Sequence, residues 1–195
     1  EPMDKKVNVV VDAMGGDYAP YETVKGAVEA INEKDNLIVT LVGQETAIRE
    51  ELSKYEFASD KIEVVHAEDV ITNDEAPVLA IRRKKESSIV VGLNLLKAQK
   101  ADAFVSAGST GAVLVGAQLI AGRIKGVERP PLAPLIPTAK GVSLLVDCGA
   151  NVDARSTHLV QFAKMGSLYM EKVIGIENPR VAIVNIGAEE EKGNM

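Results

Sequence analysis

The sequence predicts a doubly wound α/β fold, with a mainly parallel sheet and helices on both of its faces. Two observations lead to this prediction. Short runs such as 7–11 and 37–42 are apolar at successive positions, which is typical of strands buried on both faces. Longer amphipathic segments separate these runs. Because crossovers between parallel strands are right-handed, the alternation builds a sheet covered on both sides, with ligands bound at the carboxyl ends of its strands.

The elements follow from periodicity and from turn residues. Apolar runs predict strands, and apolar positions three or four residues apart predict helices. The first helix, for example, carries Val24, Ala27, Val28 and Ile31 on one face. Strands are expected at 7–11, 37–42, 61–66, 101–106, 142–146 and 180–186, and helices at 21–31, 45–55, 78–100, 110–123 and 157–174.

Two segments need a separate interpretation. The helix over 78–100 is expected in two pieces, with an interruption near Ser87 and Ser88. The proline-rich stretch 129–137 is expected to form an extended connection or an edge strand, because proline cannot donate to a central ladder.

Composition limits the classes of function. The 195 residues carry a net charge of −6, which argues against a general nucleic-acid binder, since such a protein needs a basic face. Cys148 is the single cysteine, so no disulfide forms within the chain and a reducing compartment is expected. We expect Cys148 to be a buried packing thiol. The longest apolar stretch, 112–121, is far shorter than the roughly 20 residues that a membrane span needs.

The organisation along the chain predicts one α/β domain over 1–195. We expect a flexible start at 1–6 and a polar loop at 188–195. A strand-end loop of this kind normally leads into a helix, so the chain is expected to be the N-terminal part of a longer catalytic chain.

Two glycine-rich loops follow predicted strands. Gly15 and Gly16 come after Asp12, and the segment Gly108, Ser109, Thr110 and Gly111 opens a predicted helix. Glycines let a backbone approach a ligand closely, and free N–H groups at a helix N-terminus bind anions. A plain turn at Gly15 and Gly16, and a helix cap at Ser109 or Thr110, are the alternatives. No Gly-x-Gly-x-x-Gly signature is present, which weakens a nicotinamide reading.

Charged and polar groups gather at four further places. The densest basic cluster is Arg82, Arg83, Lys84 and Lys85, for which a solvated helix face is the simplest interpretation. The loop after the fifth strand holds Asp147 and Asn151, which would order a metal, a water molecule or neighbouring backbone. His158, at the start of the next helix, is expected to cap or pack. The last predicted strand carries Asn185, and the loop beyond it carries Lys192 and Asn194.

Seven segments in order resemble the PlsX family of bacterial phosphate acyltransferases. Single motifs of this kind are weak, but the ordered set covers essentially the whole chain. The segments are 11–17, 82–85, 106–112, 122–126, 129–130, 147–153 and 192–194.

The resemblance implies an enzyme that makes acyl phosphate from acyl-[acyl-carrier-protein] and inorganic phosphate. It also implies a fold similar to phosphotransacetylase and isocitrate dehydrogenase, a homodimer, and no metal or cofactor. A cytoplasmic enzyme that associates peripherally with the membrane would pass its product to a membrane glycerol-3-phosphate acyltransferase for phospholipid synthesis.

The resemblance suggests roles for the candidate residues. Gly108, Ser109, Thr110 and Gly111 would cradle phosphate beside Gly15 and Gly16, while Asp12, Asp147 and Asn151 would hold the loops. Lys192 would neutralise phosphate or the oxyanion, and Asn185 or Asn194 would orient the substrate. The basic cluster at 82–85 would dock the acidic carrier protein. A phosphotransacetylase, a dehydrogenase on the same fold and an inactive phosphate-binding fragment stay open as alternatives.

Overall fold

The computed structural model describes residues 5–185 and 187 of the chain. Contacts divide it into two compact units, Glu1–Gly122 (unit 1) and Arg123–Met195 (unit 2). Each unit is described by itself. The expectations of a single domain, of a flexible start at 1–6 and of a loop at 188–195 stay predictions, and residues 1–4 and 188–195 lie outside the described part.

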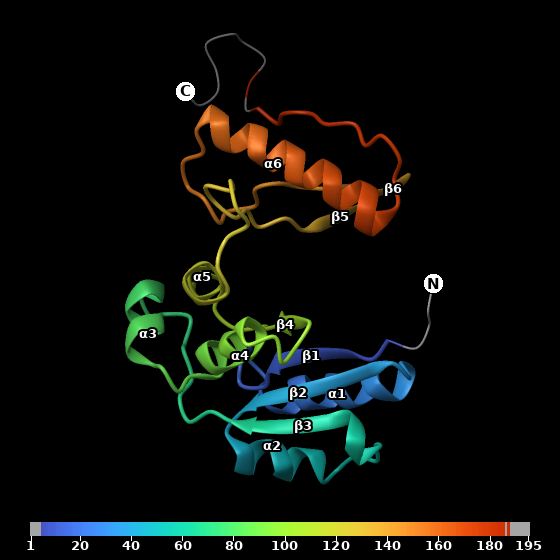
Figure 1. Ribbon diagram of the computed structural model, residues 1–195, viewed down its shortest axis with the longest axis vertical. Coiled ribbons are helices and arrows are strands. Elements are labelled where there is room, and N and C mark those ends of the chain that lie inside the picture. Colours follow the sequence, from blue (N-terminus) through green and yellow to red (C-terminus); the bar gives the residue numbers. More distant parts are fainter. Residues whose placement is uncertain (1–4, 186, 188–195) are drawn as a thin grey trace. The chain divides into compact units, whose positions relative to one another are not determined.

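Unit 1 is built on a four-stranded parallel sheet. Its strands are β1 (Val7–Asp12), β2 (Leu37–Gly43), β3 (Ile62–His66) and β4 (Ala103–Val105), in the order β3-β2-β1-β4 (Figure 1). The registers pair Val9 with Val39 and with Ala103, so the carboxyl ends of β1 and β4 lie at the same edge of the sheet.

The helices of unit 1 follow the strands in sequence. They are α1 (Tyr21–Glu33), α2 (Glu45–Leu52), α3 (Pro77–Arg83), α4 (Ser88–Lys97) and α5 (Thr110–Gly116), which continues as a π-helical turn over Ala117–Ala121. The expected interruption near Ser87 and Ser88 is confirmed. Ser87 ends the connection and caps α4, because its side chain accepts a hydrogen bond from the Val90 N–H.

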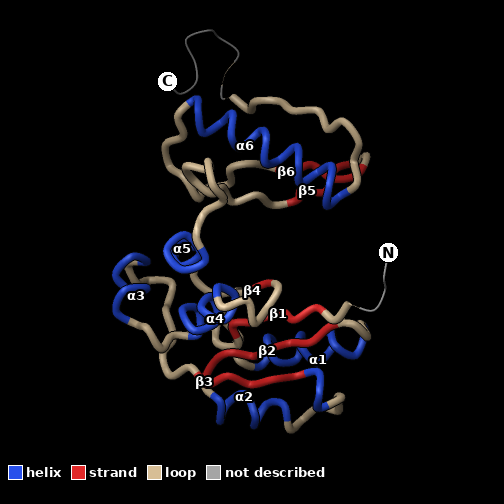
Figure 2. The backbone as a smooth tube through the Cα atoms, viewed as in Figure 1, coloured by secondary structure: helices blue, strands red, loops and turns tan. Residues whose placement is uncertain are grey.

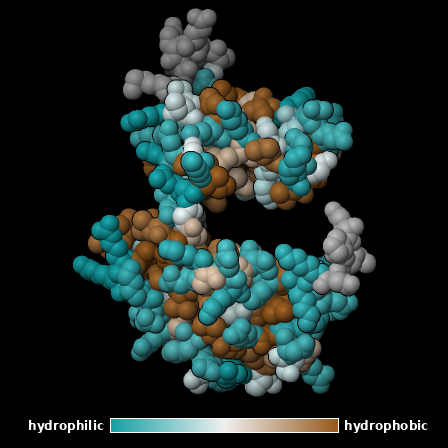
Figure 3. Space-filling model, in the orientation of Figure 1, coloured by the Kyte–Doolittle hydropathy of each residue, from teal (hydrophilic) through white to brown (hydrophobic). Residues whose placement is uncertain are grey.

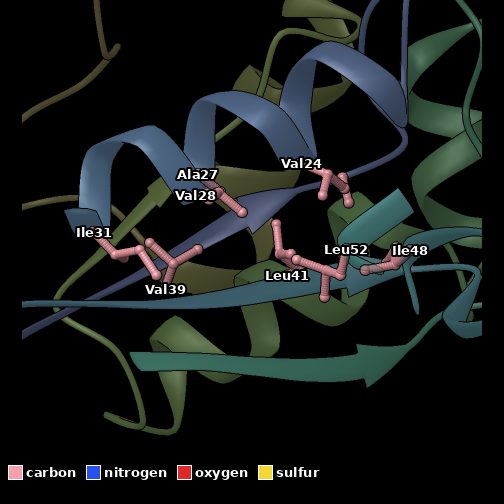
Figure 4. Packing of buried hydrophobic residues seen from close by; sticks show 9 residues of the cluster. Val24, Ala27, Val28, Ile31, Val39, Leu41, Ile48 and Leu52 are labelled. Carbon is pink, nitrogen blue, oxygen red and sulfur yellow. The ribbon is translucent and has the colours of Figure 1, made fainter. Parts of the chain in front are cut away.

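Helices cover both faces of this sheet. On one face, α1 and α2 bury aliphatic side chains against β2, among them Val28, Ile31, Leu41 and Ile48 (Figure 4). On the other face, Val10 and Val42 pack with partly buried residues of α4. Successive strand residues point to opposite faces, which is why the apolar runs are continuous. The predicted α/β fold with a parallel sheet and helices is confirmed.

Unit 2 contains a small hairpin and one long helix. The hairpin pairs β5 (Leu135–Thr138) with β6 (Gly141–Leu144) in antiparallel register, and the helix is α6 (Ser156–Tyr169), followed by a π-helical turn over Met170–Ile174 (Figure 2). Among the described residues of unit 2, the buried apolar side chains are Phe162 of α6 and Met170 of the π-helical turn. Gly166 lies against Leu144 and Val146, so α6 packs on the hairpin through a position that has no side chain.

Two expectations for this region were wrong. The strand at 142–146 is predicted to join the parallel sheet, but β6 pairs antiparallel with β5, because the two-residue connection at 139–140 permits only a hairpin. Residues 180–185 of the expected strand 180–186 form no strand, and Val181, Ile183 and Val184 are exposed. Apolar periodicity indicates burial, but a strand also needs a neighbouring strand to hydrogen-bond with. The described residues provide no such neighbour for 180–185. The proline-rich stretch, in contrast, does supply an edge strand, β5.

Candidate functional site

The glycine-rich loops of unit 1 meet at one edge of the sheet. β1 and β4 are neighbours, and the loops that follow them hold residues 13–17 and 106–109. Carboxyl ends of adjacent parallel strands are where doubly wound folds bind ligands. The structure therefore brings together the two loops that the sequence singled out.

Asp12 fastens these loops to each other. Its carboxyl group is almost fully buried, and its Oδ2 atom accepts a hydrogen bond of 2.7 Å from the Ser106 hydroxyl. The same hydroxyl oxygen accepts the Gly108 N–H at 3.0 Å, and Asp12 Oδ1 accepts the Met14 N–H at 3.1 Å. The two hydrogen bonds of this buried carboxylate, together with the bond between Ser106 and Gly108, fix the path of both loops.

The close approach of the loops requires glycine. A Cβ atom on Gly15 would lie 2.5 Å from Asp12 Oδ2 and 2.8 Å from the Gly108 nitrogen. A Cβ atom on Gly108 would lie 3.2 Å from the Gly15 Cα. Gly16 has a φ of +110°, which side chains rarely adopt. The plain-turn interpretation of Gly15 and Gly16 therefore omits their main structural role, which is contact with the second loop.

The start of α5 combines a cap with free donors. Ser109 is buried and its Oγ atom accepts the Ala112 N–H at 3.3 Å, so the cap interpretation of Ser109 is confirmed. Within the described residues, the N–H groups of Ser109, Thr110 and Gly111 have no hydrogen-bond acceptor. Thr110 is exposed. These groups form the positive end of a helix, which attracts anions.

Gly111 has a packing role as well. A Cβ atom there would come 2.8 Å from Cγ of Pro77, the first residue of α3. The absence of a side chain at Gly111 therefore lets α3 pack directly against the start of α5. Glycine at this position does not by itself indicate phosphate binding.

The basic cluster divides into two kinds of residue. Arg82, Arg83 and Lys85 are exposed. Lys84 is half-buried, and its Nζ atom donates to the Val70 carbonyl and to Glu75 Oε1, both at 2.7 Å. The hydrogen bond from Lys84 is the main cause that lowers the pKa of Glu75. Lys84 therefore fastens the loop before α3. The interpretation of the basic cluster as a solvated helix face does not hold for this residue.

In unit 2, Asp147 and Asn151 hold a loop. Asp147 accepts the Leu132 N–H at 2.6 Å and the Asn151 N–H at 2.8 Å, and the Asn151 amide donates to the Pro130 carbonyl at 3.2 Å. These contacts order neighbouring backbone, one of the three roles considered for the loop. Their part in binding phosphate stays a prediction.

Two further expectations in unit 2 have opposite outcomes. Cys148 is exposed, so the expected buried thiol was wrong; its N–H bonds the Leu132 carbonyl, which places the backbone of this loop and leaves the side chain outside. His158 is buried, and its Nδ1 atom accepts the Arg155 N–H at 3.1 Å, so the expected cap is confirmed.

Three predicted residues lie apart from the loops of unit 1 in the chain. Asn185 belongs to unit 2 and is exposed, and Lys192 and Asn194 lie outside the described residues. Their catalytic roles stay predictions. Over residues 5–185 and 187, no three His, Cys, Asp or Glu side chains gather as metal ligands, and no helix has the length and hydrophobicity to cross a bilayer.

Sequence reasoning missed two residues that organise these regions. Ser106 links Asp12 to Gly108, although nothing in its sequence context separates it from other small residues of the loop. Glu128 provides the partner of His158, with a 2.8 Å contact between Glu128 Oε2 and His158 Nε2. No signal reveals that pair, because 30 residues separate its members.

Comparison with known proteins places the chain in a family. The family model described as fatty acid synthesis protein matches residues 7–195. A protein of Clostridium novyi (strain NT) named phosphate acyltransferase is 55% identical over 188 residues, which make up 96% of this chain and 57% of that protein. A protein of Alkaliphilus oremlandii (strain OhILAs) with the same name is 55% identical over 96% of this chain and 56% of its own length. The chain thus spans just over half the length of these relatives.

Solved structures share the fold. A phosphotransacetylase from Streptococcus pyogenes superposes with a TM-score of 0.65 and 19% identity, over 90% of this chain and 57% of that one. EutD phosphotransacetylase from Staphylococcus aureus gives a TM-score of 0.63 and 23% identity, over 89% and 55% of the two chains. The expected likeness to the phosphotransacetylase fold is confirmed. Because the family model covers nearly all of its residues, the chain belongs to the fatty acid synthesis protein family.

Proposed function

We propose that the protein containing this chain transfers an acyl group from acyl-[acyl-carrier-protein] to inorganic phosphate and so makes acyl phosphate for phospholipid synthesis. The observation that carries the proposal is the pair of loops held together by Asp12, Ser106 and Gly108 beside free N–H groups. The relatives named phosphate acyltransferase support the choice of reaction.

The start of α5 has the properties of a phosphate cradle. The free N–H groups of Ser109, Thr110 and Gly111 would donate to a phosphate oxygen, as the free N–H groups of other helix N-termini do. The exposed Thr110 hydroxyl adds one more donor. Gly15 and Gly16 line the neighbouring loop and keep side chains out of the way. Ser106 and Asp12 hold this arrangement before phosphate arrives, so little reorganisation is needed on binding.

The reaction needs positioning more than activation. Phosphate is ionised near neutral pH and is itself a nucleophile, so no Ser-His-Asp relay is required. One phosphate oxygen attacks the thioester carbonyl carbon, the C–S bond breaks, and the carrier thiolate leaves and takes up a proton. The product is the acyl phosphate. Alignment of the two substrates and stabilisation of the oxyanion are what the protein supplies.

The remaining roles complete the proposal. Lys192 neutralises phosphate or the oxyanion, and Asn185 or Asn194 orients the thioester. Asp147 and Asn151 hold the loop of unit 2 through their backbone contacts. The protein acts as a cytoplasmic homodimer that associates peripherally with the membrane, where a glycerol-3-phosphate acyltransferase takes up the acyl phosphate. The family resemblance supports these assignments.

Hydroxylamine trapping of acyl phosphate tests the proposal. The intact protein is incubated with phosphate and either an acyl-carrier-protein thioester or acetyl-coenzyme A. We expect acyl hydroxamate mainly from the carrier thioester. Thr110→Ala and Lys192→Ala should each lower its formation about tenfold or more, since both remove a donor to developing charge.

The control is Thr157→Ala, which removes another exposed threonine from the first turn of a helix, α6. It should keep full activity. Normal activity in both Thr110→Ala and Lys192→Ala would show that the site is misplaced. Preference for acetyl-coenzyme A would instead favour a phosphotransacetylase.

A further inference from the structure

Helix α3 has an outward face of unusual composition. Ala80 and Ile81 are buried in the core of unit 1, so the positions 78, 79, 82 and 83 face outward. Val78 and Leu79 are 45% and 50% exposed, and the two arginines that follow one turn later are also exposed. In a space-filling view, hydrophobic side chains lie at the surface over α3 and α5, beside hydrophilic ones (Figure 3). We call Val78, Leu79, Arg82 and Arg83 the outer face of α3.

The arginines of this face are not used inside the protein. Among the described residues, neither Arg82 nor Arg83 has a hydrogen-bond or ion-pair partner. Their neighbour Lys84 is engaged with Val70 and Glu75, and the Lys85 Nζ atom donates to the Ile81 carbonyl at 3.3 Å. The four-residue basic cluster therefore reduces to two arginines whose guanidinium groups are available to a partner.

We propose that the outer face of α3 docks an acidic surface of the protein that carries the acyl group, which, on the proposed function, is acyl carrier protein. The planar guanidinium groups of Arg82 and Arg83 can each bind a carboxylate through two hydrogen bonds. Val78 and Leu79 lie one turn before them and supply the apolar centre that small interfaces need. The chain as a whole has a net charge of −6, so this basic face gives an acidic partner a defined place to bind.

The position of α3 couples docking to the candidate phosphate loop. A Cβ atom on Gly111 would lie only 2.8 Å from Cγ of Pro77, the first residue of α3. A partner on the outer face would thus bind a helix that packs directly against the start of α5. That placement suits delivery of a thioester to the loop formed by Gly108 and Gly111.

The chemistry of the face favours a protein over a lipid surface. α3 has seven residues and exposes two aliphatic side chains, with no aromatic residue. Interfacial membrane helices usually present a long apolar face with Trp, Phe or Leu. Arginine is enriched among the residues that dominate protein–protein binding, and its planar guanidinium group matches the geometry of a carboxylate.

The test compares charge reversal with a matched control. Arg82→Glu with Arg83→Glu is made in the intact protein, and Lys25→Glu with Lys34→Glu reverses two exposed charges of unit 1 elsewhere. Binding of unacylated acyl carrier protein is measured by calorimetry at low and high salt. We expect the arginine variant to bind about tenfold more weakly at low salt, with a smaller difference at high salt, and the lysine variant to bind like the parent protein.

Turnover provides a second readout. The ratio of kcat/KM for the carrier thioester to kcat/KM for a small acyl thioester should fall about tenfold in the arginine variant. Arg82→Gln with Arg83→Gln, which only neutralises the charges, should give a smaller loss and serves if the reversal disturbs folding. Leu79→Ala should also weaken carrier binding.

The outcomes separate this proposal from the proposed function. Equal carrier affinity in the parent protein and both arginine variants, or an unchanged kcat/KM ratio, overturns the docking face even when acyl phosphate forms. Weaker carrier binding by the arginine variants together with no acyl phosphate from any donor upholds the docking face and refutes the proposed reaction. If the arginine variants no longer bind vesicles of phosphatidylglycerol but keep the parent affinity for the carrier, the face binds lipid. That result would also overturn the proposal.

Discussion

Gly15 stands where the loops after β1 and β4 meet. Replacement by alanine would place a methyl group 2.5 Å from Asp12 Oδ2 and 2.8 Å from the Gly108 nitrogen, so the loops must move apart. Overpacking of this kind costs about 1–3 kcal/mol. We expect Gly15→Ala to lower the free energy of unfolding by that amount in urea titrations and to weaken phosphate binding.

Gly26→Ala is the matched control for this change. Gly26 is an exposed residue of α1, and a Cβ atom there would meet nothing within 4 Å. Alanine in an exposed helix position stabilises by about 0.4–1 kcal/mol relative to glycine. Equal effects of the two substitutions would contradict the close approach of the loops.

Residue identity predicted the site only in part. The glycines of both loops carry their own signal, because few other residues allow a tight turn beside a buried carboxylate. Ser106 carries no such signal, since the hydrogen bond that links it to Asp12 depends on a residue 94 positions earlier in the chain. Lys84 looked equivalent to Arg83 in the sequence, and only the placement of Val70 and Glu75 separates them. Contacts between distant segments are what local pattern cannot supply.

A small polar cluster joins the end of α2 to the start of α1. The Glu51 carboxyl group is buried and accepts hydrogen bonds from Lys54 at 2.5 Å and from the Tyr55 hydroxyl at 2.9 Å. The Lys54 ammonium also lies 5.4 Å from the centre of the Tyr21 ring of α1. The bond from Lys54 is the main cause that lowers the pKa of Glu51, and the bond to Glu51 is the main cause that raises the pKa of Lys54.

These directions fix how the cluster depends on pH. A lowered pKa of Glu51 in the folded state means that its contribution is present above its ordinary value of 4.5 and is lost as the pH falls through the folded value. The raised pKa of Lys54 gives a contribution that is present below its ordinary value of 10.5 and is lost as the pH rises through the folded value. Between these limits the cluster stabilises the contact of the two helices.

Glu51→Gln tests this dependence. We expect it to lower the free energy of unfolding at pH 7, with the deficit shrinking as the pH falls below 4.5, because the parent carboxylate is then losing its charge. Urea titrations from pH 3 to pH 8 measure the effect. Glu50→Gln, at an exposed neighbour in α2, is the control. A deficit that is the same at every pH would show that the charge of Glu51 does not matter.

Most elements of unit 1 were predictable because local pattern and tertiary packing agree there. Apolar positions of α1 such as Val24 and Ile31 are the ones that face β2. Unit 2 was harder, because its strands are partnered by each other and not by the parallel sheet. The connection at 139–140 lacks the Asn-Gly pair that usually marks a hairpin, and the apolar run that includes Ile183 and Val184 pairs with no strand among the described residues.

The two units differ in how much they bury. In unit 1, the clusters around β2 and around α4 bury many aliphatic side chains. In the described residues of unit 2, His158, Phe162 and Met170 are the buried ones. Local stability follows buried apolar contacts, so the two units should open with different free energies.

Hydrogen exchange of the 195-residue chain measures this difference, and α1 and α6 make a matched pair. They have 13 and 14 residues, so helix length does not separate them. α1 buries Val24, Ala27, Val28 and Ile31, whereas α6 buries only His158 and Phe162. We expect amides in the middle of α6 to exchange through low-energy local opening, and those of α1 to approach the global value, which for a domain is about 5–15 kcal/mol. Equal protection of the two helices would show that unit 2 gains its stability from contacts other than its own buried side chains.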